Sequence, residues 1–535
     1  MALSIQPAAA QKPDQASARP PGISLVLVLA VDQMRADYLT RFQDQFSGGF
    51  RYLAARGRIY TDAHQEHSCT LTAVGHSTIL TGAFPSRSGI IGNDWYDRNR
   101  KWVVPAVTAA AGDGPGAGAR IPSPRALHAT TLGDWLQQQN PNSKVFTISR
   151  KDRAAIMLGG QHPSGVFWYA PATGTFTTSE YYANGLPGWA LAYNSTRPAN
   201  KYFNKTWERV DSAKAYTRSS PDDQEGEGRL MGRRTFPYRY SGSRRPTSEF
   251  YSYLASTPFM DEMTLELAER AVRSEQLGKR GAVDLLGISL STTDSVGHTF
   301  GPHSQEIQDM MLRLDRMLDR FFKFLDKNVD LDRVLIVLTG DHGVAPLPEV
   351  PNEDGVNERA RREATQMVKE AEALLQQQYG PGPWIEREYD GNVYLNQETI
   401  RKAGVAAAEV ENQLAQVLRR MEIVEDVFTR TELTSGRMRE DPYAGLFAAC
   451  FNPDNSGDLM IRTKENVLSG AGAAGTTHGS PYRYDTHVPL IFAGPGITPG
   501  RVDSHVRTVD IAPTIAAMLG IPAPEDLDGR PLGIK

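Results

Sequence analysis

The chain has 535 residues and a formal net charge of −4. It contains no basic tract or stripe, which gives no support for binding to nucleic acid or to an anionic membrane surface, and no apolar stretch approaches the roughly 20 residues of a membrane-spanning helix. A chain of this length could form two or three domains, but no linker divides it. We therefore expect one catalytic domain with insertions, over residues 23–535.

The N-terminal residues 1–22 are rich in Ala, Pro and Gln and are predicted to form a disordered tail or the remnant of a secretory leader. Ala8, Ala9 and Ala10 resemble the small-residue end of such a leader, but a charged start and an apolar segment are absent. The chain has two cysteines, Cys69 and Cys450, and the sequence leaves open whether they pair or stay free.

Five apolar runs have the length and β-branched content of strands that are buried on both faces. In chain order they are Ile23 to Val31, Lys144 to Ser149, Val283 to Leu290, Arg333 to Leu338 and Val488 to Ala493. Helical patterns lie between them, most clearly from Ile307 to Leu325. This alternation predicts an α/β fold with a doubly wound, mostly parallel sheet flanked by helices, whose ligands bind beyond the carboxyl ends of the strands.

Two insertions account for much of the remaining length. Residues from about 161 to 259 are rich in aromatic and turn residues, which predicts a loop-rich flap beside the ligand site. Residues from about 346 to 475 predict a small α+β cap. Its expected elements are a charged helix from Glu358 to Gln378, a β-like segment from Trp384 to Leu395 and a helix from Val405 to Met421.

Six side chains that bind metals follow the predicted strands or lie in Gly-rich turns: Asp32, Asp294, His298, Asp341, His342 and His478. The spacing of Asp294 and His298 directs both side chains to one ion on a helical turn, and the glycines that flank Asp341 and His342 permit a tight turn. Each residue taken alone is more often a cap, a turn former or a solvated side chain. Because imidazole nitrogen and carboxylate oxygen are zinc ligands, the whole set predicts a two-metal hydrolase. His487 is a rival to His478, although its place before the last predicted strand fits a supporting role.

The nucleophile of such a site is a hydroxyl that a metal ion can activate. Thr72 opens a helix-like segment that ends at Gly82, and the free amides and dipole of a helix N-terminus stabilise a developing negative charge. Thr72 could also be a simple N-cap. Thr70, Ser68 and Cys69 remain open as alternatives for the nucleophile.

The stretch from Thr72 to Gly82, followed by Ser88 to Asp97, resembles the nucleophile region of the alkaline phosphatase superfamily. More narrowly it resembles the nucleotide pyrophosphatase/phosphodiesterase branch, in which threonine replaces serine. The resemblance implies an alkaline phosphatase-like fold, a periplasmic or secreted location and two Zn²⁺ per chain. One zinc would be held by Asp32, Thr72, Asp341 and His342, and the other by Asp294, His298 and His478. Oligomeric state, and whether Ca²⁺ or Mg²⁺ binds elsewhere, stay open.

Lys151 and Arg153 flank Asp152 just after a predicted strand. A phosphate monoester exposes a charged oxygen that a diester covers, so cations placed at that oxygen favour monoesters. Asn93 would donate a hydrogen bond to another phosphoryl oxygen. This combination resembles the threonine-dependent periplasmic alkaline phosphatases of bacteria. It implies an enzyme that hydrolyses small, varied phosphate monoesters through a phosphothreonine intermediate.

Four other functions compete with this interpretation. A phosphodiesterase or nucleotide pyrophosphatase, and a phosphonoacetate hydrolase, would share the metals and Thr72. A sulfatase is disfavoured because neither Cys69 nor Cys450 begins a Cys-x-Pro-x-Arg sequence. A zinc-binding scaffold without catalysis is the most distant alternative, since nucleophile, ligands and phosphate-binding residues are all present.

Overall fold

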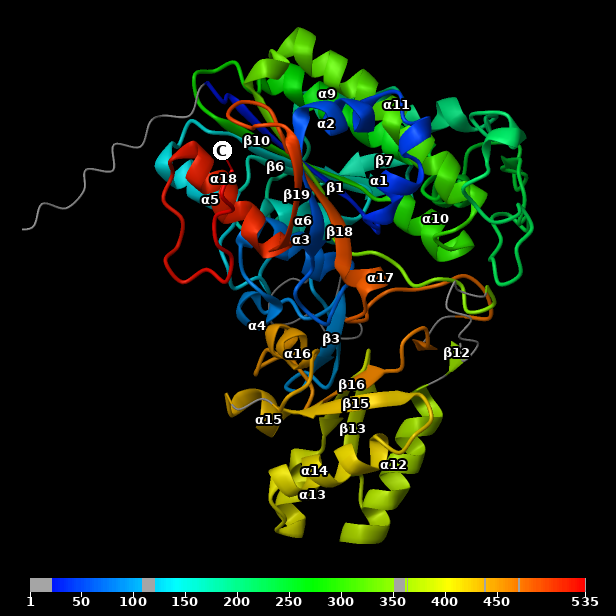
Figure 1. Ribbon diagram of the computed structural model, residues 1–535, viewed down its shortest axis with the longest axis vertical. Helices are drawn as coiled ribbons and strands as arrows, with labels where there is room; N and C mark the ends of the chain where they lie inside the picture. The colour runs from blue at the N-terminus through cyan, green and yellow to red at the C-terminus, as the bar shows by residue number, and fades with distance from the viewer. Residues whose placement is uncertain are drawn as a thin grey trace, which may run out of the picture.

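The computed structural model describes residues 22–107, 121–350, 361–362, 364–436, 439–469 and 472–534. The predicted N-terminal tail lies outside the described residues except for Gly22, and so does the predicted start of a helix at Glu358. Figure 1 shows a large body built around one twisted sheet and a smaller unit beneath it. Within the described residues, no helix is both long enough and apolar enough to cross a membrane.

The main sheet has nine strands in the order β19-β2-β18-β11-β1-β10-β5-β6-β7. Strands β11, β1, β10, β5 and β6 run parallel to one another, and β19 runs parallel to β2. Strand β18 is antiparallel to β11 and β2, and β7 is antiparallel to β6. The predicted mostly parallel sheet is confirmed. In sheet order the bounds are Gly500–Arg507, Gly57–His64, His487–Ala493, Val334–Gly340, Leu25–Val31, Asp284–Leu290, Val145–Ser149, Gly165–Ala170 and Thr175–Thr177.

Both faces of the central strands are covered, which explains their unbroken apolar sequences. In β1, Leu25, Leu27 and Leu29 join the cluster beneath the helices α2, α9 and α11, whereas the alternate residues of the same strand join the cluster beneath α5 and α18. The bounds of these helices are Gly49–Arg56, Phe259–Glu275, Gln305–Asn328, Leu132–Gln139 and Ile511–Leu519. The period of two along a strand thus divides the core into two layers.

The segment from about 161 to 259 is more deeply embedded than the predicted flap. Strands β6 and β7 extend the main sheet, and most of the aromatic residues are buried against α9 and α11. The Trp207 indole donates to Asp309 Oδ2 at 2.6 Å, and the Tyr238 hydroxyl donates to Glu306 Oε1 at 2.6 Å. Large aromatic side chains gain more from such burial than from exposure on a flap. The elements of the segment outside the sheet are α7 Gly188–Ser195, β8 Thr206–Trp207, β9 Tyr238–Arg239 and α8 Ser248–Leu254.

The cap has its own four-stranded sheet, in the order β13-β14-β16-β15, and its own apolar core. The core includes Trp384, Leu395, Leu414, Val427 and Leu459. The strands span Ile385–Tyr389, Asn392–Leu395, Leu459–Thr463 and Val424–Thr429. The helices are α12 Ala364–Tyr379, α13 Gln397–Ala403, α14 Ala407–Leu418, α15 Arg430–Thr434 and α16 Ala444–Cys450.

Several short elements complete the structure. They are α1 Asp37–Arg41, α4 Pro85–Ser88, the hairpin of β3 Asp94–Asp97 and β4 Trp102–Pro105, the pair of β12 Arg361–Arg362 and β17 Leu468–Ser469, and α17 Arg483–Thr486. Cys69 and Cys450 form a disulfide, which links the loop before α3 (Thr72–Thr81) to the end of α16 in the cap. The structure therefore resolves the state of the two cysteines, which the sequence left open.

Replacement of Cys69 and Cys450 by serine is expected to lower the free energy of unfolding by about 2–5 kcal/mol, because the cross-link closes a long loop and restricts the unfolded chain. The loop is long, since the two residues are 381 positions apart. Thermal unfolding with and without a reductant would measure the effect. Reductant should lower the melting temperature of the wild-type protein and leave that of the double variant unchanged. Equal sensitivity of the two proteins would contradict a stabilising disulfide.

Candidate metal centre and active site

The predicted ligands come together at the carboxyl edge of the parallel strands. Asp32 directly follows β1, and Asp341 and His342 directly follow β11. Asp294 and His298 lie on α10 (Thr292–Phe300), the helix that follows β10. Because β1 lies between β10 and β11 in the sheet, three chain-distant carboxylates meet at one edge.

One group of ligands is formed by Asp294, His298 and His478. Asp294 Oδ1 lies 3.3 Å from His298 Nε2 and 3.7 Å from His478 Nε2, and the ligand atoms of the three residues all lie within 4.8 Å of one another. The i, i+4 spacing on α10 places the first two side chains on the same face of that helix, as predicted. Burial by itself raises the pKa of Asp294, but the charges of Lys151 and His298 outweigh it and hold that pKa well below its ordinary value.

The second group lies beside the first and is fully buried. His342 Nε2 is 3.6 Å from Asp32 Oδ1 and 3.3 Å from Asp341 Oδ2. Asp32 Oδ1 is buried and accepts no hydrogen bond from the residues that the structure describes. Asp32 Oδ2 and Asp341 Oδ2 are also buried, and they face Lys151 Nζ at 2.8 Å and His76 Nδ1 at 3.1 Å. Burial and the neighbouring Asp341 raise the pKa of Asp32. One ammonium does not balance the buried carboxylates of Asp32, Asp294 and Asp341, so the donor set fits a divalent metal.

In each of the three histidines, the Nδ1 atom lies against a backbone carbonyl and the Nε2 atom is left to face the site. These Nδ1 atoms lie 2.8 Å from Thr476 O in His298, 2.9 Å from Gly343 O in His342 and 2.8 Å from Thr70 O in His478. A carbonyl oxygen can only accept, so each Nδ1 carries the proton and each Nε2 presents a lone pair. Backbone carbonyls that fix the tautomer in this way are common around metal-binding imidazoles.

The Thr72 hydroxyl faces both ligand groups from the first turn of α3. Its Oγ1 lies 3.5 Å from His342 Nε2 and accepts a hydrogen bond from Lys151 Nζ at 3.1 Å. Gly75 lets the helix approach this closely, since a Cβ there would lie 2.1 Å from Asp341 O. The close approach brings the hydroxyl, the ammonium and the metal ligands into one pocket.

Lys151 connects the two ligand groups. Its Nζ lies 2.8 Å from Asp32 Oδ2 and 2.7 Å from Asp294 Oδ2, in addition to its bond to Thr72. Asn93 lies beside Thr72, because its Oδ1 accepts a hydrogen bond from the backbone N–H of the neighbouring Ala73 at 2.9 Å. Arg153 lies in the first turn of α6 (Asp152–Gly159), and its Nε is buried without a hydrogen bond to any described residue. The lysine thus lies deeper among the carboxylates than its position in the sequence indicated.

The alternative residues occupy other places. Cys69 is bound to Cys450, and the Thr70 hydroxyl donates to Ser480 O at 2.8 Å. His487, the rival of His478, begins β18 and lies against Thr61 O through its Nε2. Of the hydroxyls considered, Thr72 is therefore the one with a contact to a ligand histidine.

Three residues of the site were not identified from the sequence. His76 Nδ1 lies 3.1 Å from Asp341 Oδ2, Gln33 N donates to Asp341 Oδ1 at 3.0 Å, and Arg150 Nη2 lies 3.7 Å from Asp294 Oδ2. His76 is four positions after Thr72 on the same helix, a spacing that could have revealed it. Gln33 and Arg150 are sequence neighbours of predicted residues, and no separate signal marks them.

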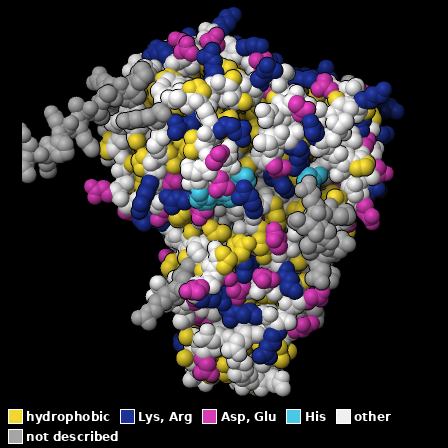
Figure 2. Space-filling view, in the orientation of Figure 1, with side chains coloured by type: hydrophobic (Ala, Val, Ile, Leu, Met, Phe, Trp, Pro, Cys, Tyr) yellow, Lys and Arg dark blue, Asp and Glu magenta, His cyan; other side chains and the backbone are white. Residues whose placement is uncertain are grey.

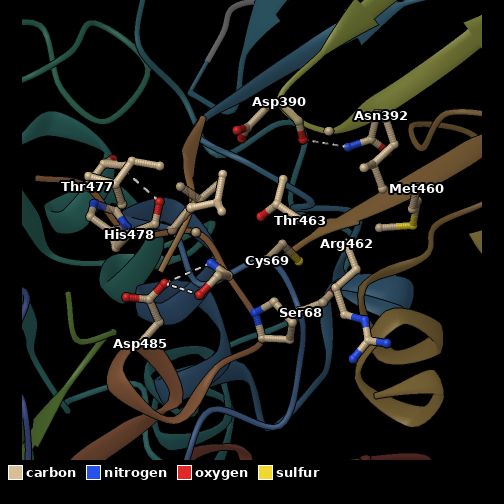
Figure 3. Close-up of a pocket in the computed structure, with 18 of the residues that line it drawn as sticks. Ser68, Cys69, Asp390, Asn392, Met460, Arg462, Thr463, Thr477, His478 and Asp485 are labelled. Carbon is tan, nitrogen blue, oxygen red and sulfur yellow. Dashed lines mark hydrogen bonds between the residues drawn. The ribbon is translucent and has the colours of Figure 1, made fainter. Parts of the chain in front are cut away.

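The site opens into a cleft of about 780 Å³ between the core and the cap. Figure 3 shows Thr477 and His478 on one side of this cleft, with Met460, Arg462 and Thr463 of β16 on the other. Asn93 also lines it. A substrate that reaches the metal ligands would therefore contact both the catalytic body and the cap.

Comparison with known proteins agrees with this geometry. The sequence pattern of the family described as type I phosphodiesterase / nucleotide pyrophosphatase matches residues 26–483. Alkaline phosphatase PafA of Elizabethkingia meningoseptica is 34% identical over 529 residues, which cover 96% of this chain and 94% of that protein. Alkaline phosphatase PhoV of Synechococcus elongatus is 32% identical over 538 residues, which cover 96% of this chain and 93% of that protein.

Solved structures share the fold. The crystal structure of wild-type PafA matches with a TM-score of 0.86 and 34% identity, over 97% of this chain and 99% of that one. A PafA variant with substitutions at a threonine, an asparagine, a lysine and an arginine matches equally well, with a TM-score of 0.86 and 33% identity. Murine ectonucleotide pyrophosphatase / phosphodiesterase 5 matches with a TM-score of 0.52 and 13% identity, over 93% of this chain and 96% of that one, which shows a shared fold alone.

These matches extend over nearly the whole chain and confirm both the predicted fold and the predicted phosphatase class. The chain therefore belongs to the type I phosphodiesterase / nucleotide pyrophosphatase family of the alkaline phosphatase superfamily, and it is an enzyme of the phosphatase class.

Proposed function

We propose that this enzyme is an alkaline phosphatase that hydrolyses small, varied phosphate monoesters through a covalent phosphate ester of Thr72, with two Zn²⁺ ions bound. The observation that carries the proposal is the position of the Thr72 hydroxyl, 3.1 Å from Lys151 Nζ and 3.5 Å from His342 Nε2 at the start of a buried helix. The disulfide between Cys69 and Cys450 supports a periplasmic or secreted location, because such bonds persist in oxidising compartments.

The donor set divides into two zinc sites. Asp32, Thr72, Asp341 and His342 would hold one ion, and Asp294, His298 and His478 the other. Imidazole nitrogens and carboxylate oxygens match the preferences of zinc. When bound, such a pair supplies charge stabilisation for the attacking and leaving oxygens of an in-line displacement and lowers the pKa of a coordinated hydroxyl.

The first half of the reaction forms a bond from Thr72 Oγ1 to phosphorus and breaks the bond from phosphorus to the leaving alcohol. The start of α3 and the ammonium of Lys151 stabilise the negative charge that develops on the threonine oxygen and the phosphoryl group. In the second half, a water oxygen attacks phosphorus from the opposite side. Inorganic phosphate leaves, and the threonine hydroxyl is restored.

The preference for monoesters comes from cations that address the phosphoryl group. Lys151 and Arg153 would neutralise the oxygen that only a monoester exposes, and Asn93 would donate to a further oxygen. The PafA variant supports these roles, since its altered residues are of the same four types. In that variant the threonine and the asparagine are 21 positions apart, which is also the separation of Thr72 and Asn93 in this chain. Its lysine and arginine are two positions apart, as are Lys151 and Arg153.

Replacement of Thr72 by alanine is expected to reduce kcat/KM for p-nitrophenyl phosphate by more than about 10⁴-fold, because the nucleophile is lost. Metal content should stay at the wild-type level, since Asp32, Asp341 and His342 remain. Thr72→Ser is the matched control and should keep measurable turnover. Undiminished turnover in Thr72→Ala would exclude the phosphothreonine route.

Replacement of Arg153 or Lys151 by alanine is expected to lower kcat/KM for the monoester by about 100-fold, the size of effect seen when one charge-stabilising donor is lost. The value for bis-p-nitrophenyl phosphate should fall far less, because a diester lacks the exposed oxygen. Lys101→Ala, at a side chain that is 60% exposed, is the control. Equal losses for both esters would favour a phosphodiesterase. Preferential hydrolysis of phosphonoacetate would favour the phosphonate-cleaving alternative.

Removal of metal with a chelator is expected to abolish turnover, and added Zn²⁺ should restore it. Mass spectrometric metal analysis of His298→Ala should find one zinc fewer at the catalytic centre than in the wild type, because one of three ligands of that ion is missing. Full turnover of the metal-free protein would refute a metal-dependent mechanism. A zinc-loaded protein that releases no phosphate from any ester would instead indicate a non-catalytic scaffold.

A further inference from the structure

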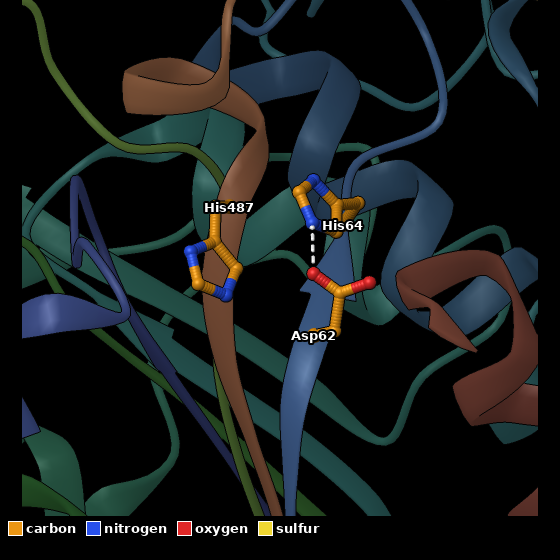
Figure 4. Close-up of side chains that lie close together, drawn as sticks. All are labelled: Asp62, His64 and His487. Atoms are coloured by element: carbon orange, nitrogen blue, oxygen red, sulfur yellow. Dashed lines mark hydrogen bonds and ion pairs between the residues drawn. The ribbon is translucent and has the colours of Figure 1, made fainter. Parts of the chain in front are cut away.

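A second cluster of metal-binding side chains lies away from the active site, at one end of strands β2, β18 and β19. It consists of Asp62, His64 and His487, whose ligand atoms all lie within 4.8 Å of one another. Figure 4 shows Asp62 and His64 on one strand, with His64 directed at Asp62, and His487 beside them on the neighbouring strand. In Figure 2, histidine side chains gather on the surface near β18, next to both basic and acidic side chains.

The strand register brings these side chains together. Asp62 and His64 are two residues apart on β2 and therefore point to the same face. His487 is the cross-strand partner of His64, and His505 on β19 is the partner of Asp62. Directly opposed residues in a sheet have Cβ atoms about 4.5–5.5 Å apart, which suits a shared ion.

The ring nitrogens of the two candidate histidines have defined roles. His487 Nε2 lies 2.9 Å from Thr61 O and carries the proton, so the lone pair is on Nδ1, at the edge of the ring away from Asp62 (Figure 4). A half-turn of the ring about its bond to Cβ would direct Nδ1 to the side of Asp62 and His64. His64 Nδ1 lies 3.2 Å from Thr486 Oγ1, and its Nε2 is 3.0 Å from Asp62 Oδ1. A proton on His64 Nδ1, directed to Thr486 Oγ1, leaves the lone pair of Nε2 on the side of Asp62.

His505 orients the carboxylate rather than completing the set. Its Nδ1 lies 3.0 Å from Asp62 Oδ2, and its Nε2 lies 2.8 Å from Glu66 Oε1. Both nitrogens therefore donate to carboxylates, which leaves no lone pair for an ion. Its ring also stacks on His64 at a centroid distance of 5.1 Å, and His487 stacks on the His64 ring at 4.8 Å.

Arg483 occupies the place where an added cation would go. Its Nη1 lies 3.2 Å from Asp62 Oδ1 and 3.1 Å from His64 Nε2. The side chain is 63% exposed, so it can turn into solvent when another cation arrives, at little cost. The presence of a guanidinium between these two atoms shows that the position attracts positive charge.

We propose that Asp62, His64 and His487 form a third metal site, selective for a divalent transition ion such as Zn²⁺ and separate from the catalytic pair. Two imidazole nitrogens and one carboxylate favour Zn²⁺, Ni²⁺ or Cu²⁺ over Ca²⁺ and Mg²⁺, which prefer oxygen ligands. Among the described residues, no hydrogen bond or ion pair joins these three side chains to the catalytic ligands. The ion would link β2 to β18 at the end of the sheet.

The test uses the full-length enzyme without an affinity tag, at equilibrium in dialysis against micromolar Zn²⁺, with metal per chain measured by mass spectrometry. We expect the wild type to bind one more Zn²⁺ per chain than a His64→Ala/His487→Ala variant. Retained phosphatase turnover of the variant serves as the control for folding. His162→Ala, at a histidine whose side chain is 81% exposed, is the matched control and should bind as much zinc as the wild type.

A second variant keeps the proposal testable even where the double variant fails to fold. Arg483→Ala removes the competing cation and should lower the dissociation constant of the third Zn²⁺ by about threefold or more, because like charges at short range repel. Equal zinc content in the wild type and the double variant would overturn the proposal. So would an Arg483→Ala variant whose zinc affinity is unchanged or weaker.

Discussion

The active site depends on the burial of three carboxylates, Asp32, Asp294 and Asp341, at the carboxyl edge of neighbouring strands. Several negative charges removed from water in so small a volume are unfavourable unless positive charge accompanies them. Lys151 supplies one ammonium between Asp32 and Asp294, and histidines approach from α10 and from the Gly-rich turn around His478. Lys151 alone does not balance the three carboxylates, which suits the site to a metal ion.

The position of Thr72, the proposed nucleophile, follows from the same edge of the sheet. Helix α3 approaches Asp341 so closely that position 75 has no room for a side chain. The loop before it is attached on two sides, because Cys69 is bonded to the cap and Thr70 O lies against His478 Nδ1. Thr72 is thus placed by its helix, by the cap and by a metal ligand together. This arrangement restricts the motion of the hydroxyl, which favours a reaction that depends on in-line geometry.

The cap and the aromatic insertion have different relations to the core. The cap has its own sheet and apolar cluster and forms one wall of the cleft, so it is suited to contact the leaving group. The segment from about 161 to 259 has no separate cluster of this kind in the described chain, because most of its aromatic residues belong to the same core as α9 and α11. Loss of the cap should therefore affect the cleft, whereas loss of the aromatic insertion would expose the core.

The sequence by itself determined the five central strands and the doubly wound class, because buried parallel strands are continuous apolar runs. It also proposed the ligand residues, since ligands follow the carboxyl ends of such strands, and the fold brings these residues together. It also identified Thr72 and Lys151 through their places after predicted turns and strands. Only the tertiary structure decided that Cys69 pairs with Cys450, that His76, Gln33 and Arg150 join the site, and that His487 meets His64 across a strand pair instead of joining His478. The periodicity of apolar residues along a segment indicates which face of a helix or strand each residue occupies. The partners across strands and between distant segments are set by register and packing, which no short stretch of sequence contains.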